Sequence, residues 1–223
     1  MKTFKKLLTI IAITPILLSS IEASQRDITI MRVAVFASAL TDIYVFWQDE
    51  NSPMLKLVPD FDKLGVSYLQ GKEFNEEDSR YLRNNRLALT ADWKKVLIDN
   101  SYFSISGHTE FMVNRWYSTN KSSQNQEGYI YAITPMFTYT FKDIKVSNYN
   151  LYTEFGIGLA YMDNSMVEDR EKSTQFQFAD SIGVGFKSTN YQIGYRFTHI
   201  SNLNIGTPNP SLDFHQIMLL YRF

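Results

Sequence analysis

From about residue 63 to the C-terminus, bulky apolar residues alternate along the chain with small or polar ones. Eight stretches show this alternation, separated by polar runs: Lys63–Lys72, Leu82–Leu97, Tyr102–Thr119, Gly128–Phe141, Asn150–Asn164, Ser173–Lys187, Tyr191–Asn202 and Asp213–Phe223. A period of two residues predicts β-strands, because successive side chains of a strand point to opposite faces. Residues 63–223 are therefore expected to form one all-β domain of eight antiparallel strands.

The apolar face of these strands carries the large aromatic side chains, and the opposite face carries small and polar ones. In the fifth stretch, Phe155 and Tyr161 lie on one face, while Glu154 and Gly156 lie on the other. A soluble barrel turns its apolar face inward, whereas a membrane barrel turns that face to lipid. Strands of about 9–11 residues suffice to cross a bilayer when tilted. The pattern predicts an eight-stranded transmembrane β-barrel of the bacterial outer membrane, with a lumen filled by side chains.

The connecting segments alternate between longer and mostly shorter ones, which is typical of outer-membrane barrels with long external loops. The charged runs in two long loops, "NQE" and "EDRE", are interpreted as solvated. His108 shares the lumen side with Glu110 and is expected in an interior polar cluster. Asp180 falls on the lipid-facing side, where a bulge could turn it inward, and a structural role is expected for it.

The N-terminal 23 residues have the features of a secretory signal peptide. Lys2, Lys5 and Lys6 precede an apolar run, and small residues surround a cleavage point after Ala23. This pattern fits a signal peptide better than the alternative of a buried N-terminal helix. Residues 24–62 have mixed periodicity and stay unassigned between a periplasmic helix, a plug and an extra pairing element. Export with a membrane barrel predicts localisation in the outer membrane of a Gram-negative bacterium.

The net charge and the absence of cysteine argue against several classes of function. The formal net charge is -1, so nothing points to nucleic acid as a partner. The chain has no cysteine, which excludes disulfides, thiolate metal sites and a cysteine nucleophile. No set of residues has a recognisable metal-ligand spacing, so neither a metal nor another cofactor is expected.

The candidate chemistry lies near the C-terminus, where polar residues continue an apolar face. His199 and Ser201 follow the lipid-facing stripe of the seventh stretch, and Asp213 begins the same face of the eighth. Counting turns places all three at the outer rim of the barrel. A serine hydroxyl becomes a nucleophile when a base takes its proton and a carboxylate holds that base. Asn202 and Asn209 are nearby amides that could donate to an oxyanion.

The alternative is that these residues only end an aromatic girdle, where an interfacial His or Ser needs no function. If they are catalytic, the substrate is an ester reachable from the membrane plane, either lipopolysaccharide or a phospholipid of the outer leaflet. Three functions stay open on the residues alone: a lipid A esterase, another outer-membrane phospholipase or acyltransferase, and a non-catalytic barrel serving adhesion or membrane integrity.

The segment "FTHISNLNIGTPNPSLDF" resembles the signature of the outer-membrane lipid A 3-O-deacylases of the PagL type. That family has His-x-Ser-Asn, a Pro-Asn pair, an acidic residue and a last strand ending in an aromatic residue. The matching positions are His199, Ser201, Asn202, Pro208, Asn209, Asp213 and Phe223. The family usually has Glu where this chain has Asp213, and small residues where it has Leu203 and Asn204.

The resemblance implies a role for each matching side chain. Ser201 would be the nucleophile, His199 the general base and Asp213 the acid that orients it. Asn209, together with Asn202, would polarise the ester carbonyl. The implied substrate is lipid A of lipopolysaccharide in the outer leaflet, cleaved at its 3-linked hydroxyacyl chain. The expected partners are this lipid and the surrounding outer-membrane lipid. A homodimer is a further possibility, and the sequence leaves the oligomeric state open.

Overall fold

The computed structural model describes residues 57–73 and 82–223. Eleven strands lie in these ranges, eight of them long and three of only two residues. The long strands are β1 (Pro59–Glu73), β2 (Leu82–Trp93), β4 (Phe103–Ser118), β5 (Glu127–Val146), β6 (Tyr149–Met162), β9 (Phe176–Lys187), β10 (Tyr191–Ser201) and β11 (Leu212–Arg222). The short ones are β3 (Ile98–Asp99), β7 (Met166–Val167) and β8 (Arg170–Glu171). None of the described residues forms a helix long and apolar enough to cross a membrane.

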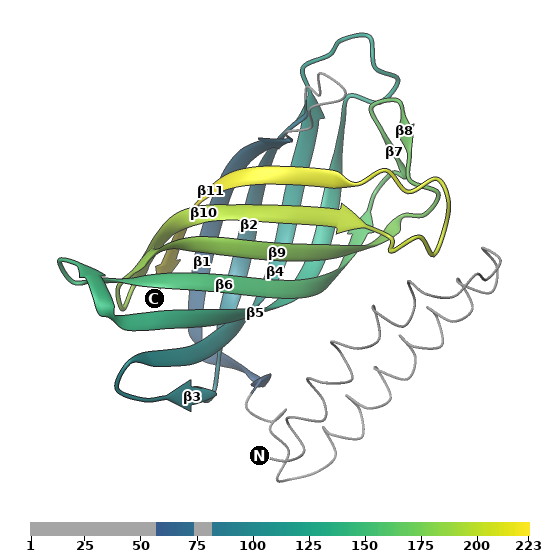
Figure 1. Cartoon of the computed structure of the whole chain (residues 1–223). Coiled ribbons are helices and arrows are strands. Elements are labelled where there is room, and N and C mark those ends of the chain that lie inside the picture. Colours follow the sequence, from purple (N-terminus) through teal and green to yellow (C-terminus); the bar gives the residue numbers. More distant parts are fainter. Residues whose placement is uncertain (1–56, 74–81) are drawn as a thin grey trace, which may run out of the picture. The chain divides into compact units, whose positions relative to one another are not determined.

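The eight long strands pair around a closed ring in the order β2-β1-β11-β10-β9-β6-β5-β4, and a β2–β4 pairing closes it (Figure 1). Every pairing in the ring is antiparallel. The predicted all-β, eight-stranded antiparallel barrel is therefore confirmed. Closure leaves no unpaired strand edge, which a barrel within lipid requires.

The two faces of the wall differ as the alternation predicts. Large apolar side chains are exposed on the outside, among them Leu87, Phe155, Ile182, Tyr191 and Ile217. Small and polar residues point inward and are buried. At Gly158, for example, a Cβ atom would lie 2.1 Å from the Thr134 hydroxyl oxygen, so the lumen has room only for hydrogen at this position. Exposed aromatic and aliphatic groups outside a filled interior define a lipid-embedded wall.

The two strand ends that extend furthest beyond the predicted limits are those of β1 and β5. β1 begins at Pro59, where Pro59 pairs with Trp93 beyond a register shift. β5 continues past Phe141 to Val146, because the hairpin with β6 resumes pairing at Lys145 and Asn150 after an irregular stretch. Such irregular pairing breaks the alternation from which the boundaries were predicted.

A neutral network of paired charges fills the middle of the barrel. Arg86 donates to Glu110, and Arg196 donates to Glu110 at 2.9 Å and, through Nε, to Glu154 at 2.8 Å. All four side chains are at most 1% exposed. His108 lies beside this group, with its Nε2 atom 3.3 Å from Glu110 Oε1, as the sequence predicted. The two arginines and two glutamates compensate each other's charge, as buried ions require.

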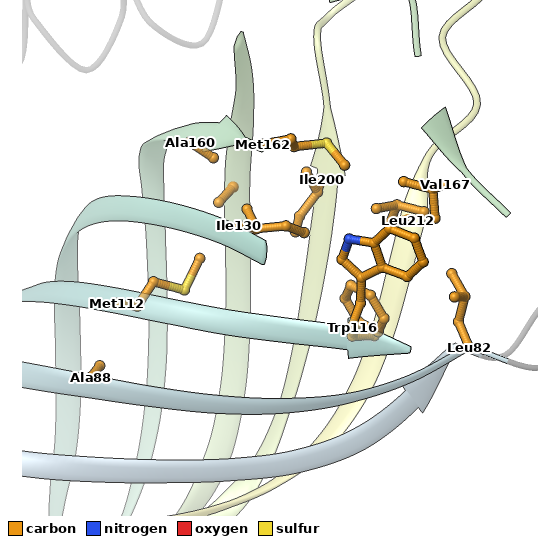
Figure 2. Packing of buried hydrophobic residues seen from close by; sticks show 12 residues of the cluster. Leu82, Ala88, Met112, Trp116, Ile130, Ala160, Met162, Val167, Ile200 and Leu212 are labelled. Carbon is orange, nitrogen blue, oxygen red and sulfur yellow. The ribbon is translucent and has the colours of Figure 1, made fainter. Parts of the chain in front are cut away.

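An apolar cluster fills the barrel near the end that carries the β10–β11 loop (Figure 2). Trp116 and Ile130 are completely buried in it, together with Ile200 and Leu212. Ile200 lies between His199 and Ser201 in the sequence, and Leu212 directly precedes Asp213. The inward side chains of the two candidate catalytic strands are thus packed into the cluster, which fixes the wall on which the outward side chains stand.

Candidate active site

The residues predicted to carry chemistry come together on the outer face of β10 and β11. His199 and Asp213 are direct partners in the strand register. Ser201 is the last residue of β10 and shares the outer face with His199, since it is two positions further along the strand. Ser201 is 5% exposed, while the side chains of His199 and Asp213 are 36% and 22% exposed. The serine therefore lies beneath the rim, next to two partners that remain accessible.

A chain of hydrogen bonds joins the three side chains. His199 Nδ1 lies 2.6 Å from Asp213 Oδ1, and His199 Nε2 lies 3.0 Å from Ser201 Oγ. An ionised carboxylate accepts only, so Nδ1 carries the proton and Nε2 is free to accept the serine proton. The Ser211 hydroxyl donates to the other oxygen of Asp213 at 2.8 Å. The arrangement is geometrically able to activate a serine nucleophile.

Asp180 lies on the other side of His199. It is the register partner of His199 on β9 and stays on the outer face, so no bulge turns it inward. Its Oδ1 atom is buried without a hydrogen-bond partner among the described residues. His199 is therefore flanked by a carboxylate on each of its two neighbouring strands.

The two asparagines of the β10–β11 loop have different surroundings. Asn202 is completely buried, and its amide nitrogen donates to the Lys172 carbonyl at 3.1 Å and to the Ser173 hydroxyl at 3.0 Å. Its backbone N–H donates to Asn209 Oδ1 at 3.0 Å. Asn209 is thereby oriented with its amide nitrogen away from Asn202, at 3.1 Å from Asn204 Oδ1. Of the two side chains, Asn209 has its donor nearer to solvent.

Lys172 anchors this loop from inside, although the sequence gave no reason to single it out. Its ammonium group is completely buried and donates to the carbonyl of Ile200 at 3.3 Å and to that of Pro210. These carbonyls lie on the two sides of the loop, one directly before Ser201 and the other directly after Asn209. The buried ammonium group of Lys172 thus holds the two ends of the β10–β11 loop together.

The interpretation of "EDRE" as solvated charges is wrong for two of its residues. Arg170 donates to both carboxylate oxygens of Glu73, at 2.9 and 2.7 Å, and to the Ser211 carbonyl at 3.3 Å. Glu168 is 9% exposed and accepts from the Ser118 hydroxyl. Strands β7 and β8 hold these residues beside the β10–β11 loop (Figure 1). The sequence could not predict the pairing of these two residues, because contacts between loops that are distant in the sequence leave no periodic pattern of residues.

The remaining sequence candidates lie nearby without joining the hydrogen-bonded chain. His215 is half-buried on the outer face and contacts the Tyr195 hydroxyl. Leu203 and Asn204 have φ angles of 54° and 57°, in the left-handed region. Glycine adopts this region without strain and asparagine tolerates it, whereas leucine is disfavoured there.

Fold and site together define a small outer-membrane β-barrel with a Ser–His–Asp array on its outer wall. Comparison with known proteins narrows this class. The family described as "Lipid A 3-O-deacylase (PagL)" matches residues 83–222. The chain belongs to this family, and it is a barrel of the bacterial outer membrane.

Individual relatives agree with the family match. The chain is 41% identical over 73 residues to "Lipid A deacylase PagL" of Bordetella bronchiseptica, covering 32% of this chain and 41% of that protein. It is 26% identical over 133 residues to "Lipid A deacylase PagL" of Pseudomonas aeruginosa, covering 59% and 73%. The crystal structure of "the outer membrane enzyme PagL" superposes with a TM-score of 0.62 at 23% identity, covering 70% of this chain and 98% of that one. This last likeness supports the fold.

Proposed function

We propose that this protein is an esterase that removes an acyl chain, the one linked at position 3, from lipid A of lipopolysaccharide. The observation that carries the proposal is the unbroken Ser201–His199–Asp213 hydrogen-bonded chain on the lipid-facing wall. The site opens to the membrane leaflet and not to the lumen, so its substrate is a lipid. Lipid A and position 3 come from the family's description and from the relatives' names.

The first half of the reaction forms an acyl-serine. Ser201 Oγ attacks the ester carbonyl carbon while His199 Nε2 takes the hydroxyl proton. Asp213 stabilises the imidazolium that forms, and Asn209 donates its amide hydrogen to the oxyanion of the tetrahedral intermediate. When the intermediate collapses, the bond between the carbonyl carbon and the sugar oxygen breaks. His199 then gives its proton to that oxygen, and the deacylated lipid leaves with a free hydroxyl.

The second half restores the serine. His199 takes a proton from water, the resulting hydroxide attacks the acyl-serine, and the fatty acid leaves as Ser201 regains its proton from His199. Asn202 and Lys172 hold the loop in position throughout, because both side chains donate hydrogen bonds to groups of the protein itself. No metal or redox group takes part in this scheme.

Mass spectrometry of lipid A tests the proposal after expression in a host whose lipid A carries the 3-linked chain. We expect the loss of one hydroxyacyl chain with the parent protein and no loss with Ser201→Ala. In a purified assay, Ser201→Ala should slow release at least about a thousandfold, because triad members act as a unit. Ser104→Ala, on β4 outside the site, is the matched control and should keep the parent rate.

Other outcomes identify the alternatives. A gain in mass corresponding to an added acyl chain would indicate an acyltransferase, and unchanged lipid A with loss of phospholipid chains would indicate a phospholipase. Normal deacylation by folded Ser201→Ala would exclude the serine mechanism.

A further inference from the structure

Two basic side chains stand on the outer wall next to the catalytic strands. Lys72 is one residue from the end of β1, and Arg83 is one residue from the start of β2. The two are direct partners in the strand register, and both are exposed. Neighbours on the same face of β2 toward the middle of the wall, Leu87 and Leu89, are exposed apolar residues. The pair therefore marks the outer rim of the lipid-facing belt.

This basic pair adjoins the candidate active site through β11. Lys72 is the register partner of His215, which lies two residues after Asp213 on the same face. With a rise of about 3.4 Å per residue and about 4.8 Å between strands, the Cα of Lys72 lies roughly 8 Å from that of Asp213. A groove of about 370 Å³ runs along this surface, and its lining includes Lys72, Arg83, Tyr117, Tyr195 and His215.

The position of the two basic groups suits the binding of a lipid anion. A lysine or arginine on the lipid face of a barrel is destabilising near the bilayer midplane, and the cost fades toward the interface. At the interface, the anions that such side chains meet are lipid headgroup phosphates. The planar guanidinium group of Arg83 can donate hydrogen bonds to two phosphate oxygens at once, and the Lys72 ammonium group adds a positive charge at the adjacent position. The two groups together suit a phosphomonoester better than a single carboxylate.

Lipid A carries phosphate groups close to its acyl esters. It is a phosphorylated glucosamine disaccharide, so a phosphate lies within one or two sugar rings of any acyl ester on it. The groove reaches from the basic pair to β11 at His215, two residues along the strand from Asp213. A sugar held by its phosphate at one end of this surface can therefore present an ester at the other.

We propose that Lys72 and Arg83 form a binding site for a phosphomonoester of the substrate's sugar headgroup and so orient the ester toward Ser201. This inference rests on the proposed function and adds to it a determinant of substrate choice. The site binds the intact and the deacylated lipid alike, so it acts on KM more than on kcat.

The test uses the purified full-length chain in detergent micelles with two substrates. One is lipid A with both phosphates, and the other is the same lipid A after phosphatase treatment. We expect the parent to have at least a tenfold higher kcat/KM on the phosphorylated form. Lys72→Gln with Arg83→Gln should raise KM for that form about tenfold or more, leave kcat within about twofold, and remove the preference between the substrates. Lys72→Arg with Arg83→Lys keeps both charges and should retain the preference.

Controls separate this site from general charge effects and from folding. Lys94→Gln with Lys95→Gln removes two positive charges at the opposite end of β2 and should change neither parameter. Heat-modifiable gel mobility confirms that each barrel is folded, and the single variants Lys72→Gln and Arg83→Gln stand in if the double variant does not fold.

The outcomes distinguish this inference from the proposed function. If the parent releases fatty acid equally well from both lipids, or if the double variant loses rate equally on both, the phosphate site is wrong while the esterase activity stands. If the parent releases no fatty acid from either lipid, the proposed function itself fails. A second measurement, binding of each lipid to Ser201→Ala, then decides on the phosphate site independently of turnover.

Discussion

Replacing Asp213 with asparagine keeps the size of the side chain and removes its charge. In the parent, Asp213 accepts the Nδ1 proton of His199 at 2.6 Å and a second proton from Ser211 at 2.8 Å. An asparagine amide facing His199 would donate to Nδ1 and move the ring proton to Nε2. That tautomer cannot accept the Ser201 proton. If the amide oxygen faces His199 instead, the hydrogen bond persists, but the imidazolium loses its stabilising charge.

The expected size of the effect follows from these contacts. Loss of the correct tautomer in serine proteases lowers kcat by about 10⁴, which sets the upper end. Asp180 remains beside His199 in the variant and still stabilises positive charge, so we expect a fall of at least about a hundredfold in kcat/KM, equivalent to about 2.7 kcal/mol. Asp213→Glu retains the charge, but the 2.6 Å between Asp213 Oδ1 and His199 Nδ1 is already a short charge-assisted hydrogen bond, so no gap is left for a longer side chain to close. The added methylene must displace the ring, and we expect a loss of roughly tenfold.

The assay is the initial rate of fatty-acid release from lipid A in detergent, with gel mobility confirming the folded barrel. Asp213→Ala is expected to match Asp213→Asn in rate. If folded Asp213→Asn turns over as fast as the parent, Asp213 is not the orienting acid. Asp180→Asn would then show whether the second carboxylate beside His199 has that role.

Two further changes test the loop that carries the site. Lys172→Met removes the ammonium group that donates to the carbonyls of Ile200 and Pro210, so kcat should fall roughly tenfold to a hundredfold because the loop is misplaced. Lys121→Met, at an exposed position, is the control. An unchanged kcat for Lys172→Met would contradict this account. Leu203→Gly removes a Cβ from a residue in the left-handed region that is 49% exposed. It should raise the free energy of unfolding by roughly 0.5–1 kcal/mol, once the greater conformational entropy of glycine in the unfolded chain is subtracted. Urea titration of the folded barrel measures this, and a lower midpoint would show that the leucine side chain itself stabilises the loop.

Alternation along the chain was sufficient to predict the barrel and the face of each candidate residue. The stripe from Tyr191 to Phe197 is on the outside, and His199, Ser201 and Asp213 continue that face as parity requires. Odd and even positions along a strand predict which face of the sheet a side chain occupies, but they do not predict which residue it pairs with on the neighbouring strand. They could not say that His199 would pair with Asp213 on one side and with Asp180 on the other, because register depends on how the hairpins close.

The supporting residues were beyond prediction for a different reason. Lys172 and Arg170 act through contacts between loops far apart in the sequence, and a charged side chain in a loop is normally solvated. Only the folded arrangement shows that these cations face carbonyl groups and a carboxylate. The prediction of a signal peptide over residues 1–23 lies outside the described residues, as does the greater part of the unassigned segment 24–62, and both stay predictions.

Under the proposed function, the position of Ser201, His199 and Asp213 on the outside of a filled barrel determines how the enzyme meets its lipid substrate. A lipid cannot enter the lumen, which the arginine–glutamate network and the apolar cluster occupy. Encounter therefore takes place by lateral diffusion within one leaflet, and the relevant concentration is the mole fraction of substrate among the lipids around the wall. Both products remain in or next to that leaflet as well. Diluting the substrate with inert lipid or detergent at constant total amount should therefore slow the reaction, even though the bulk concentration of substrate does not change.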